Sequence, residues 1–160
     1  MKYISKDEAL AKLQRYCAYQ DRCHQEVRSK LLDLGIRGHD LEEIMADLII
    51  EKFLDEERYA RSFVRGKYRI KKWGRTKIRQ GLKQKNISAY CMKMGFSEIE
   101  EDVYYNNLVS ILEKKAPLTK ASNSYQRNAK LAKFAIQKGY EPYLVWEVVK
   151  DKFGNSSDNK

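Results

Sequence analysis

The segment "KIRQGLKQKNI", residues 77–87, has two counterparts in the chain: "EVRSKLLDLGI", residues 26–36, and "KLAKFAIQKGY", residues 130–140. Each has apolar residues at its second and sixth positions, Gly or Asn at its tenth, and an apolar residue last. Apolar residues four apart predict one buried helix face, and Gly or Asn predicts a left-handed residue that ends the helix. Because the copies begin 51 and 53 residues apart, we predict tandem repeats of about three helices each.

Helical periodicity continues over the rest of the chain. Apolar residues recur at intervals of three and four, and strand-like alternation is not evident. The predicted fold class is therefore all-α, with about three tandem three-helix repeats. We expect helices at residues 6–19, 22–34, 40–53, 55–72, 75–85, 88–93, 97–114, 124–138 and 142–152.

These helices indicate how the chain divides. We expect an N-terminal helix at 1–20, a first repeat at 21–73, a second at 74–115, a third, shortened repeat at 116–153 and a tail at 154–160. The segment "KKAPLTKASNS", residues 114–124, is the best internal linker. The tail lacks apolar residues, which predicts disorder.

Two helix starts carry capping signals. Asp55 precedes Glu56 and Glu57, which predicts a side-chain cap and a first turn matched to the positive helix end. Ser97 and Glu100 have the spacing of a capping box, which predicts a helix that starts there. The three acidic residues also raise the alternative of a metal site. Capping is favoured because adjacent side chains on a helix point in different directions.

Positive charge is concentrated in residues 58–85, which contain twelve Lys or Arg and no Asp or Glu. The whole chain has 32 basic and 22 acidic residues, so the remainder holds 20 against 22 and a net charge of −2. A basic block of this kind indicates a phosphate-bearing or strongly acidic partner. The alternative is a solvated helical face, which the complete absence of acids disfavours.

The charges of this segment fall on one side of a helix. At 100° per residue, a stripe within about 80° is formed by Arg58, Arg61, Arg65, Arg69 and Lys72. The candidate contact residues are Arg58, Arg61, Arg65, Lys67, Arg69, Lys71, Lys72, Arg75, Lys77, Arg79, Lys83 and Lys85. Tyr68 and Trp73 are candidates for stacking on unpaired bases, with ordinary packing as the alternative.

Patterns for catalysis or metal binding are weak. Gly66-Lys67 lacks the first Gly and the following Ser or Thr of a phosphate-binding loop. Cys17, Cys23 and His24 lack paired metal-ligand spacing, and two histidines support no nucleophile with a base. We therefore expect no enzymatic activity, no cofactor and no metal.

The composition also indicates where in the cell the protein is expected. Three cysteines, an odd number at wide spacing, favour a reducing cytoplasm over a disulfide scaffold. No apolar run reaches 18 residues, and the start of the chain has no secretory apolar region. We expect a cytoplasmic monomer that does not enter a membrane.

Three segments of the chain together resemble the signature of a known family. They are "FLDEERYARSFVRGK", residues 53–67, "WGRTKIRQGLKQKNI", residues 73–87, and "RCHQEVRSKLLDLGI", residues 22–36. The first is similar to the Leu-Asp-(Asp/Glu)-x-Arg-Tyr-Ala signature of the RecX family, the bacterial regulatory proteins of the RecA recombinase, and the other two resemble two further segments of that family. Cys23 stands where Ser is usual and Asn86 where Gly is usual, and after residue 115 the similarity is one of pattern.

The resemblance implies a fold and a partner. It implies tandem three-helix repeats forming an elongated, curved body that binds in the groove of the RecA–DNA filament. Such proteins typically restrain strand exchange, ATP hydrolysis and coprotease activity. Of the matching residues Asp55, Arg58, Tyr59 and Ala60, we interpret Asp55, Tyr59 and Ala60 as mainly structural.

Three hypotheses follow for function. The first is a negative regulator of RecA filaments in DNA repair and recombination. Such a regulator would bind RecA carboxylates, single-stranded DNA phosphates or both. The alternative is a general single-stranded DNA- or RNA-binding module without a recombinase partner. The third is a structural helical adaptor whose charge only aids solubility.

Overall fold

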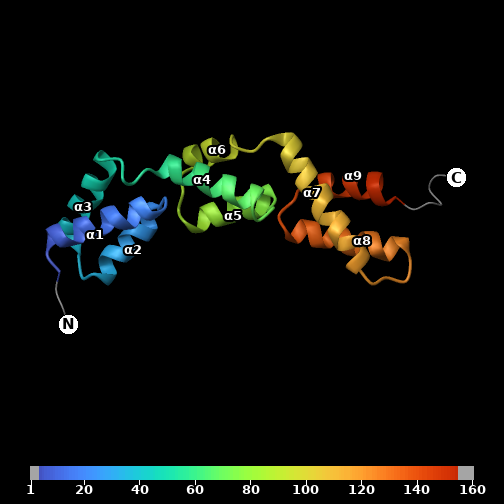
Figure 1. Ribbon diagram of the computed structural model, residues 1–160, viewed down its shortest axis with the longest axis horizontal. Coiled ribbons are helices and arrows are strands. Elements are labelled where there is room, and N and C mark those ends of the chain that lie inside the picture. Colours follow the sequence, from blue (N-terminus) through green and yellow to red (C-terminus); the bar gives the residue numbers. More distant parts are fainter. Residues whose placement is uncertain (1–3, 155–160) are drawn as a thin grey trace. The chain divides into compact units, whose positions relative to one another are not determined.

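The computed structural model describes residues 4–154, in which the regular secondary structure is entirely helical and no strand occurs (Figure 1). The helices in chain order are α1 (Lys6–Tyr19), α2 (His24–Asp33), α3 (Gly38–Ile50), α4 (Glu56–Arg69), α5 (Arg75–Gln84), α6 (Ala89–Phe96), α7 (Glu101–Lys115), the 3-10 turn η1 (Ala116–Leu118), α8 (Ser124–Gln137) and α9 (Pro142–Phe153). The all-α prediction is confirmed. Of the expected disordered tail, residues 155–160 lie outside the described residues.

The three repeat segments end in the same backbone turn. Gly35, Asn86 and Gly139 have φ of 83°, 58° and 103°. In each case the next residue donates its N–H to the carbonyl five residues earlier, at 2.9 Å (Ile36 to Leu31), 3.1 Å (Ile87 to Leu82) and 3.2 Å (Tyr140 to Ala135). This is the Schellman arrangement, which satisfies carbonyls that the helix leaves open. The predicted repeat is confirmed.

The aligned apolar residues are buried in all three copies. The second position is Val27, Ile78 or Leu131, and the sixth is Leu31, Leu82 or Ala135, each 0% exposed. The residue after the turn, Ile36, Ile87 or Tyr140, is also buried. One pattern of burial and one turn therefore recur on α2, α5 and α8.

Four predicted helix boundaries lie three or four residues from the observed ones: residue 53 against Ile50, 72 against Arg69, 93 against Phe96 and 97 against Glu101. The helix expected to reach residue 72 ends at Arg69, because Lys72 adopts φ of 56° and the N–H of Trp73 bonds to the Lys67 carbonyl at 2.9 Å. The helix expected from Ser97 begins at Glu101, with Glu100 as its N-cap, so the capping box does not form. Residues 97–100 instead connect α6 to α7 and bury Ile99. The Asp55 cap is confirmed, since Asp55 Oδ1 accepts the Arg58 N–H at 2.9 Å.

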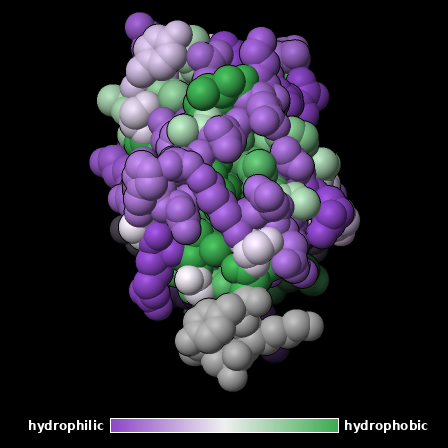
Figure 2. All heavy atoms as spheres, turned by 90° about the vertical axis from the view of Figure 1, so that its left-hand side faces the viewer, coloured by the Kyte–Doolittle hydropathy of each residue, from purple (hydrophilic) through white to green (hydrophobic). Residues whose placement is uncertain are grey.

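The chain forms two compact units, Met1–Phe63 with Leu82–Gly95 and Val64–Gly81 with Phe96–Lys160. In the first unit, α1, α2 and α3 surround one apolar core that includes Leu13, Leu31 and Leu48. Figure 2 shows a face on which hydrophilic side chains surround small hydrophobic areas. Burial of one stripe from each helix is the main stabilising contribution here.

In the second unit, α7, α8 and α9 pack on one another, and the chain before α5 touches the end of α8 (Figure 1). Gly74 donates its N–H to the Lys138 carbonyl and Thr76 to the Gly139 carbonyl, both at 2.9 Å. A Cβ added to Gly74 would lie 2.2 Å from the Gly139 carbonyl carbon. Glycine at position 74 is therefore required by a close approach of two backbones.

Substitution of Gly139 by Ala should destabilise the protein more than the same change at Gly35. Both residues have positive φ, which costs Ala about 1–2 kcal/mol. At Gly139 the new Cβ would also lie 2.5 Å from Lys77 Cβ, whereas no atom lies within 4 Å at Gly35. Overpacking adds about 1–3 kcal/mol, so the urea midpoint should fall further for Gly139→Ala. Equal midpoints for the two variants would contradict this close approach.

Candidate polyanion-binding surface

The twelve candidate cations lie on α4, on α5, on the connection between them and just after α5. Arg58, Arg61, Arg65 and Arg69 follow one side of α4 at intervals of three and four. Lys72, expected to continue this stripe, lies beyond the helix end and donates to Asn107 Oδ1 at 3.3 Å. The α4 stripe therefore consists of four arginines.

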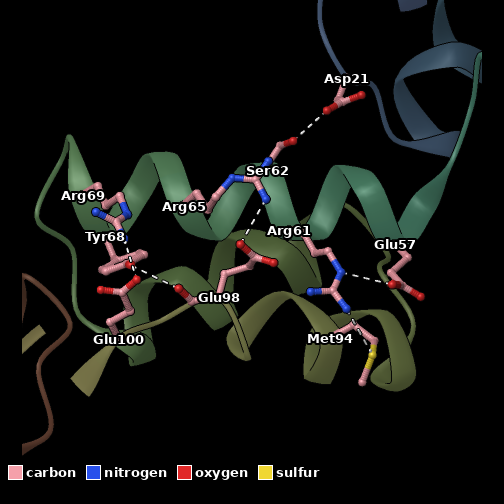
Figure 3. Close-up of polar contacts among 10 residues, drawn as sticks. All are labelled: Asp21, Glu57, Arg61, Ser62, Arg65, Tyr68, Arg69, Met94, Glu98 and Glu100. Atoms are coloured by element: carbon pink, nitrogen blue, oxygen red, sulfur yellow. Dashed lines mark hydrogen bonds and ion pairs between the residues drawn. The ribbon is translucent and has the colours of Figure 1, made fainter. Parts of the chain in front are cut away.

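Each arginine of the α4 stripe meets a carboxylate of the chain itself. Arg61 Nε lies 3.0 Å from Glu57, as Figure 3 shows together with the following two pairs. Arg65 lies 3.1 Å from Glu98 and Arg69 lies 3.2 Å from Glu100. Their side chains are between 23% and 61% exposed, so each pair contributes only about 0–1 kcal/mol. They nevertheless balance the charge of the stripe, which therefore presents less net charge to a partner than its sequence predicts.

Arg58 is hydrogen-bonded near the start of α4, and its contact with a partner stays a prediction. Its Nε donates to Asp21 at 2.7 Å, and its two terminal nitrogens donate to the carbonyls of Lys52 and Phe53 at 3.0 and 3.1 Å. Ser62 Oγ donates to the other Asp21 oxygen at 2.6 Å (Figure 3). These charge-assisted bonds fix the side chains of Arg58 and Asp21, so a structural role explains Arg58 better.

The two stacking candidates differ in the structure. Tyr68 is 0% exposed and donates its hydroxyl to the Glu98 carbonyl at 3.0 Å, so its ring cannot stack on a base in this conformation. The Trp73 ring is half-buried, and the ammonium groups of Lys67 and Lys77 lie 4.7 and 4.4 Å from its centroid. Stacking by Trp73 stays a prediction.

Arg75 belongs to a polar network that joins α5 to α7 and α9. It lies 3.0 Å from Glu141, also pairs with Glu101, and sits 4.1 Å above the Tyr104 ring. Tyr104 donates its hydroxyl to Glu141 and accepts the Arg75 N–H at 2.9 Å. Burial opposes the charge of Arg75, but the hydrogen bonds to Glu101 and Glu141 outweigh it and raise its pKa.

Burial also raises the pKa of the Tyr104 hydroxyl, and its bond to Glu141 adds to this effect. Tyr104 therefore keeps its proton and donates it to Glu141, which also lies beside Arg75. The network explains why Arg75, a candidate contact residue, points into the protein instead. Glu101 and Glu141 were not identified from the sequence, since they lie far from Arg75 along the chain.

Four of the twelve cations form neither an ion pair nor a side-chain hydrogen bond within residues 4–154: Lys71, Lys77, Arg79 and Lys83. We call these the open central cations. Arg79 and Lys83 lie one turn apart on α5 and are exposed. Lys85, by contrast, lies 3.8 Å from Glu26. The open central cations are the part of the predicted surface that presents unbalanced charge to a partner.

The cysteines form no metal centre among the residues described. Cys17, Cys23 and Cys91 are free and buried, and burial raises the pKa of each thiol. No group of three or more His, Cys, Asp or Glu side chains within residues 4–154 has the geometry to hold a metal ion. Over the same residues, no helix is long and apolar enough to cross a membrane.

Comparison with known proteins gives consistent matches. A family model described as "RecX, second three-helix domain" matches residues 55–93, and another described as "RecX, third three-helix domain" matches residues 102–149. A protein of Clostridium botulinum (strain Alaska E43 / Type E3) named "Regulatory protein RecX" is 33% identical over 135 residues, which cover 81% of this chain and 61% of that protein. A protein of the same name from Bacillus mycoides is 26% identical over 130 residues, covering 81% and 48%.

The chain thus spans about half to three fifths of the length of these first relatives. The crystal structure of RecX from Lactobacillus salivarius superposes with a TM-score of 0.82 at 21% identity, covering 91% of this chain and 95% of that one. This likeness shows a shared fold of tandem three-helix domains.

Replacement of Arg75 by Ala should lower stability more than Arg79→Ala does. Without Arg75, Glu141 would lose its ion pair while still largely buried, at a cost of about 1–3 kcal/mol. Arg79 is exposed and forms no ion pair within residues 4–154, and its only ring contact there is with Phe96, 4.7 Å from the ring centroid, so its removal should lower the free energy of unfolding by no more than about 1 kcal/mol. Urea unfolding measures both. A stable Arg75→Ala variant would show that the network does not hold the unit together.

Proposed function

The chain belongs to the RecX family, and on that premise we propose that it modulates filaments of the RecA recombinase in DNA repair and recombination, as a restraint on the filament. The matches to the second and third RecX three-helix domains carry the proposal, because together they cover most of α4–α9. The chain acts by binding, and no catalytic step is assigned to it.

The open central cations are the contact that the structure supports best. Lys77, Arg79 and Lys83 project from α5 without an ion pair within residues 4–154. A partner rich in carboxylates or phosphates would gain attraction there without breaking an internal pair. The α4 stripe could contribute only by exchanging Glu57, Glu98 or Glu100 for an anion of the partner.

ATP hydrolysis by RecA on single-stranded DNA tests the proposal directly. We expect titration with this protein to lower the hydrolysis rate at amounts well below one molecule per RecA monomer. Control reactions in which a single-strand-binding module replaces it should need enough protein to coat the DNA. Inhibition that appears only at such coating amounts would favour a general nucleic-acid-binding module, and unchanged hydrolysis would reject the restraint.

A neutralised variant locates the contact. Lys77→Gln, Arg79→Gln and Lys83→Gln together should raise the concentration for half-inhibition of RecA about tenfold, if each residue contributes about 0.5 kcal/mol. The matched control removes the same charge from exposed cations of the first unit: Lys12→Gln, Arg15→Gln and Lys93→Gln. Equal effects of both variants would mean that net charge, and not α5, is recognised.

Neutral substitution of the open central cations is a clearer test of binding than charge reversal of the α4 arginines. Arg61→Glu, Arg65→Glu and Arg69→Glu would set carboxylates against Glu57, Glu98 and Glu100. Repulsion between like charges would then destabilise the helix and its neighbours. Loss of inhibition by such a variant would not separate binding from folding.

A further inference from the structure

A second acid-free stretch lies on the second unit. Residues 114–140 contain seven basic residues and no Asp or Glu: Lys114, Lys115, Lys120, Arg127, Lys130, Lys133 and Lys138. Outside residues 58–85 the net charge is −2, so the total charge does not indicate this basic stretch. Most of the acidic residues that offset its charge lie before residue 58. This stretch includes the end of α7, η1 and α8.

None of these seven side chains forms an ion pair within residues 4–154. Arg127 bonds to the Phe153 carbonyl at 3.1 Å, and Lys130 bonds to the Lys120 carbonyl at 2.6 Å, but neither bond neutralises charge. The α4 arginines, in contrast, all meet carboxylates. The largest unbalanced positive charge of the second unit is therefore here.

The structure gathers five of these lysines around α8. Lys130, Phe134 and Lys138 follow one row of the helix at intervals of four residues. The ammonium groups of Lys115, from α7, and Lys138 lie 4.9 and 5.9 Å from the Phe134 ring centroid. The bond from Lys130 to the Lys120 carbonyl holds the preceding connection beside α8. We call Lys115, Lys120, Lys130, Lys133 and Lys138 the α8 lysine face.

An exposed aromatic ring lies on the neighbouring row of α8. Tyr125 is 80% exposed, and it precedes Ala129 and Lys133 at intervals of four residues. Ala129 and Lys133 are also exposed, and the small side chain of Ala129 leaves the ring open on that side. An open ring on the same helix as cations without ion pairs fits a base on a strand whose phosphates those cations meet.

We propose that the α8 lysine face binds the phosphate backbone of single-stranded DNA, with Tyr125 stacking on an unpaired base. Lysines without carboxylates suit a uniform row of phosphates, whereas protein interfaces are depleted in Lys. The exposed ring favours single strands, since the bases of a duplex are stacked on one another. This inference rests on the proposed function and deepens it, by assigning DNA binding to helices other than those that carry the open central cations.

Fluorescence anisotropy with labelled oligo(dT), in the absence of RecA, tests this surface. The variant carries Lys115→Gln, Lys130→Gln, Lys133→Gln and Lys138→Gln. The matched control carries Lys12→Gln, Arg15→Gln, Arg37→Gln and Lys93→Gln, which remove the same charge from exposed positions of the first unit. We expect the α8 variant to bind about tenfold more weakly at low salt, with a salt slope smaller by about 0.7 for each phosphate that it no longer neutralises. The control should bind as the unmodified protein does.

Tyr125→Ala is a second variant that leaves the lysines in place. It should weaken binding of oligo(dT) about fivefold or more while leaving binding of duplex DNA unchanged. Unchanged oligo(dT) affinity of the α8 variant, or an equal decrease in its control, would overturn the inference. Equal weakening of single strands and duplex by Tyr125→Ala would overturn the single-strand assignment.

The two proposals can fail separately. An α8 variant that binds oligo(dT) normally but no longer inhibits RecA would overturn DNA binding by α8 and leave the proposed function standing. A protein that binds oligo(dT) through α8 yet leaves RecA unaffected would support this inference and reject the proposed function.

Discussion

The left-handed residue that ends each of α2, α5 and α8 is the constraint from which the rest of the fold follows. At Gly35, Asn86 and Gly139 the chain leaves the helix with two carbonyls satisfied and the next apolar side chain turned into the core. Only Gly, or Asn at some cost, adopts this conformation readily. At Gly139 the same turn brings the chain against Gly74, which joins the start of α5 to α8.

Internal pairing of charges decides which cations can meet a partner. Arg75 is largely buried and needs Glu141 and Glu101 to offset its desolvation. The exposed arginines of α4 meet carboxylates at little energetic gain, yet their field at a distance is reduced. On α5 and around α8, most of the cations that form no ion pair with a described residue are lysines. Both sets carry long side chains with strongly hydrated charges, which suit polyanions better than a dry protein interface.

A restraint on a filament of protein and DNA would benefit from two such surfaces. A chain that binds each component through a different surface gains effective concentration for the second once the first is bound. The open central cations and the α8 lysine face would provide these surfaces from different helices. Two distinct surfaces also give specificity, because neither DNA alone nor protein alone would satisfy both.

The sequence by itself determined the all-α class, the repeat, the Asp55 cap and the family, because helix periodicity, left-handed turns and signature residues are local properties. It misplaced the start of α7, since burial of Ile99 outweighed the capping pattern at Ser97. Only the tertiary structure decided that Tyr68 is buried, that Glu98, Glu100 and Glu141 neutralise distant arginines, and that the lysines around α8 remain open. Charge balance depends on which side chains meet in space, and segments far apart in the chain supply them.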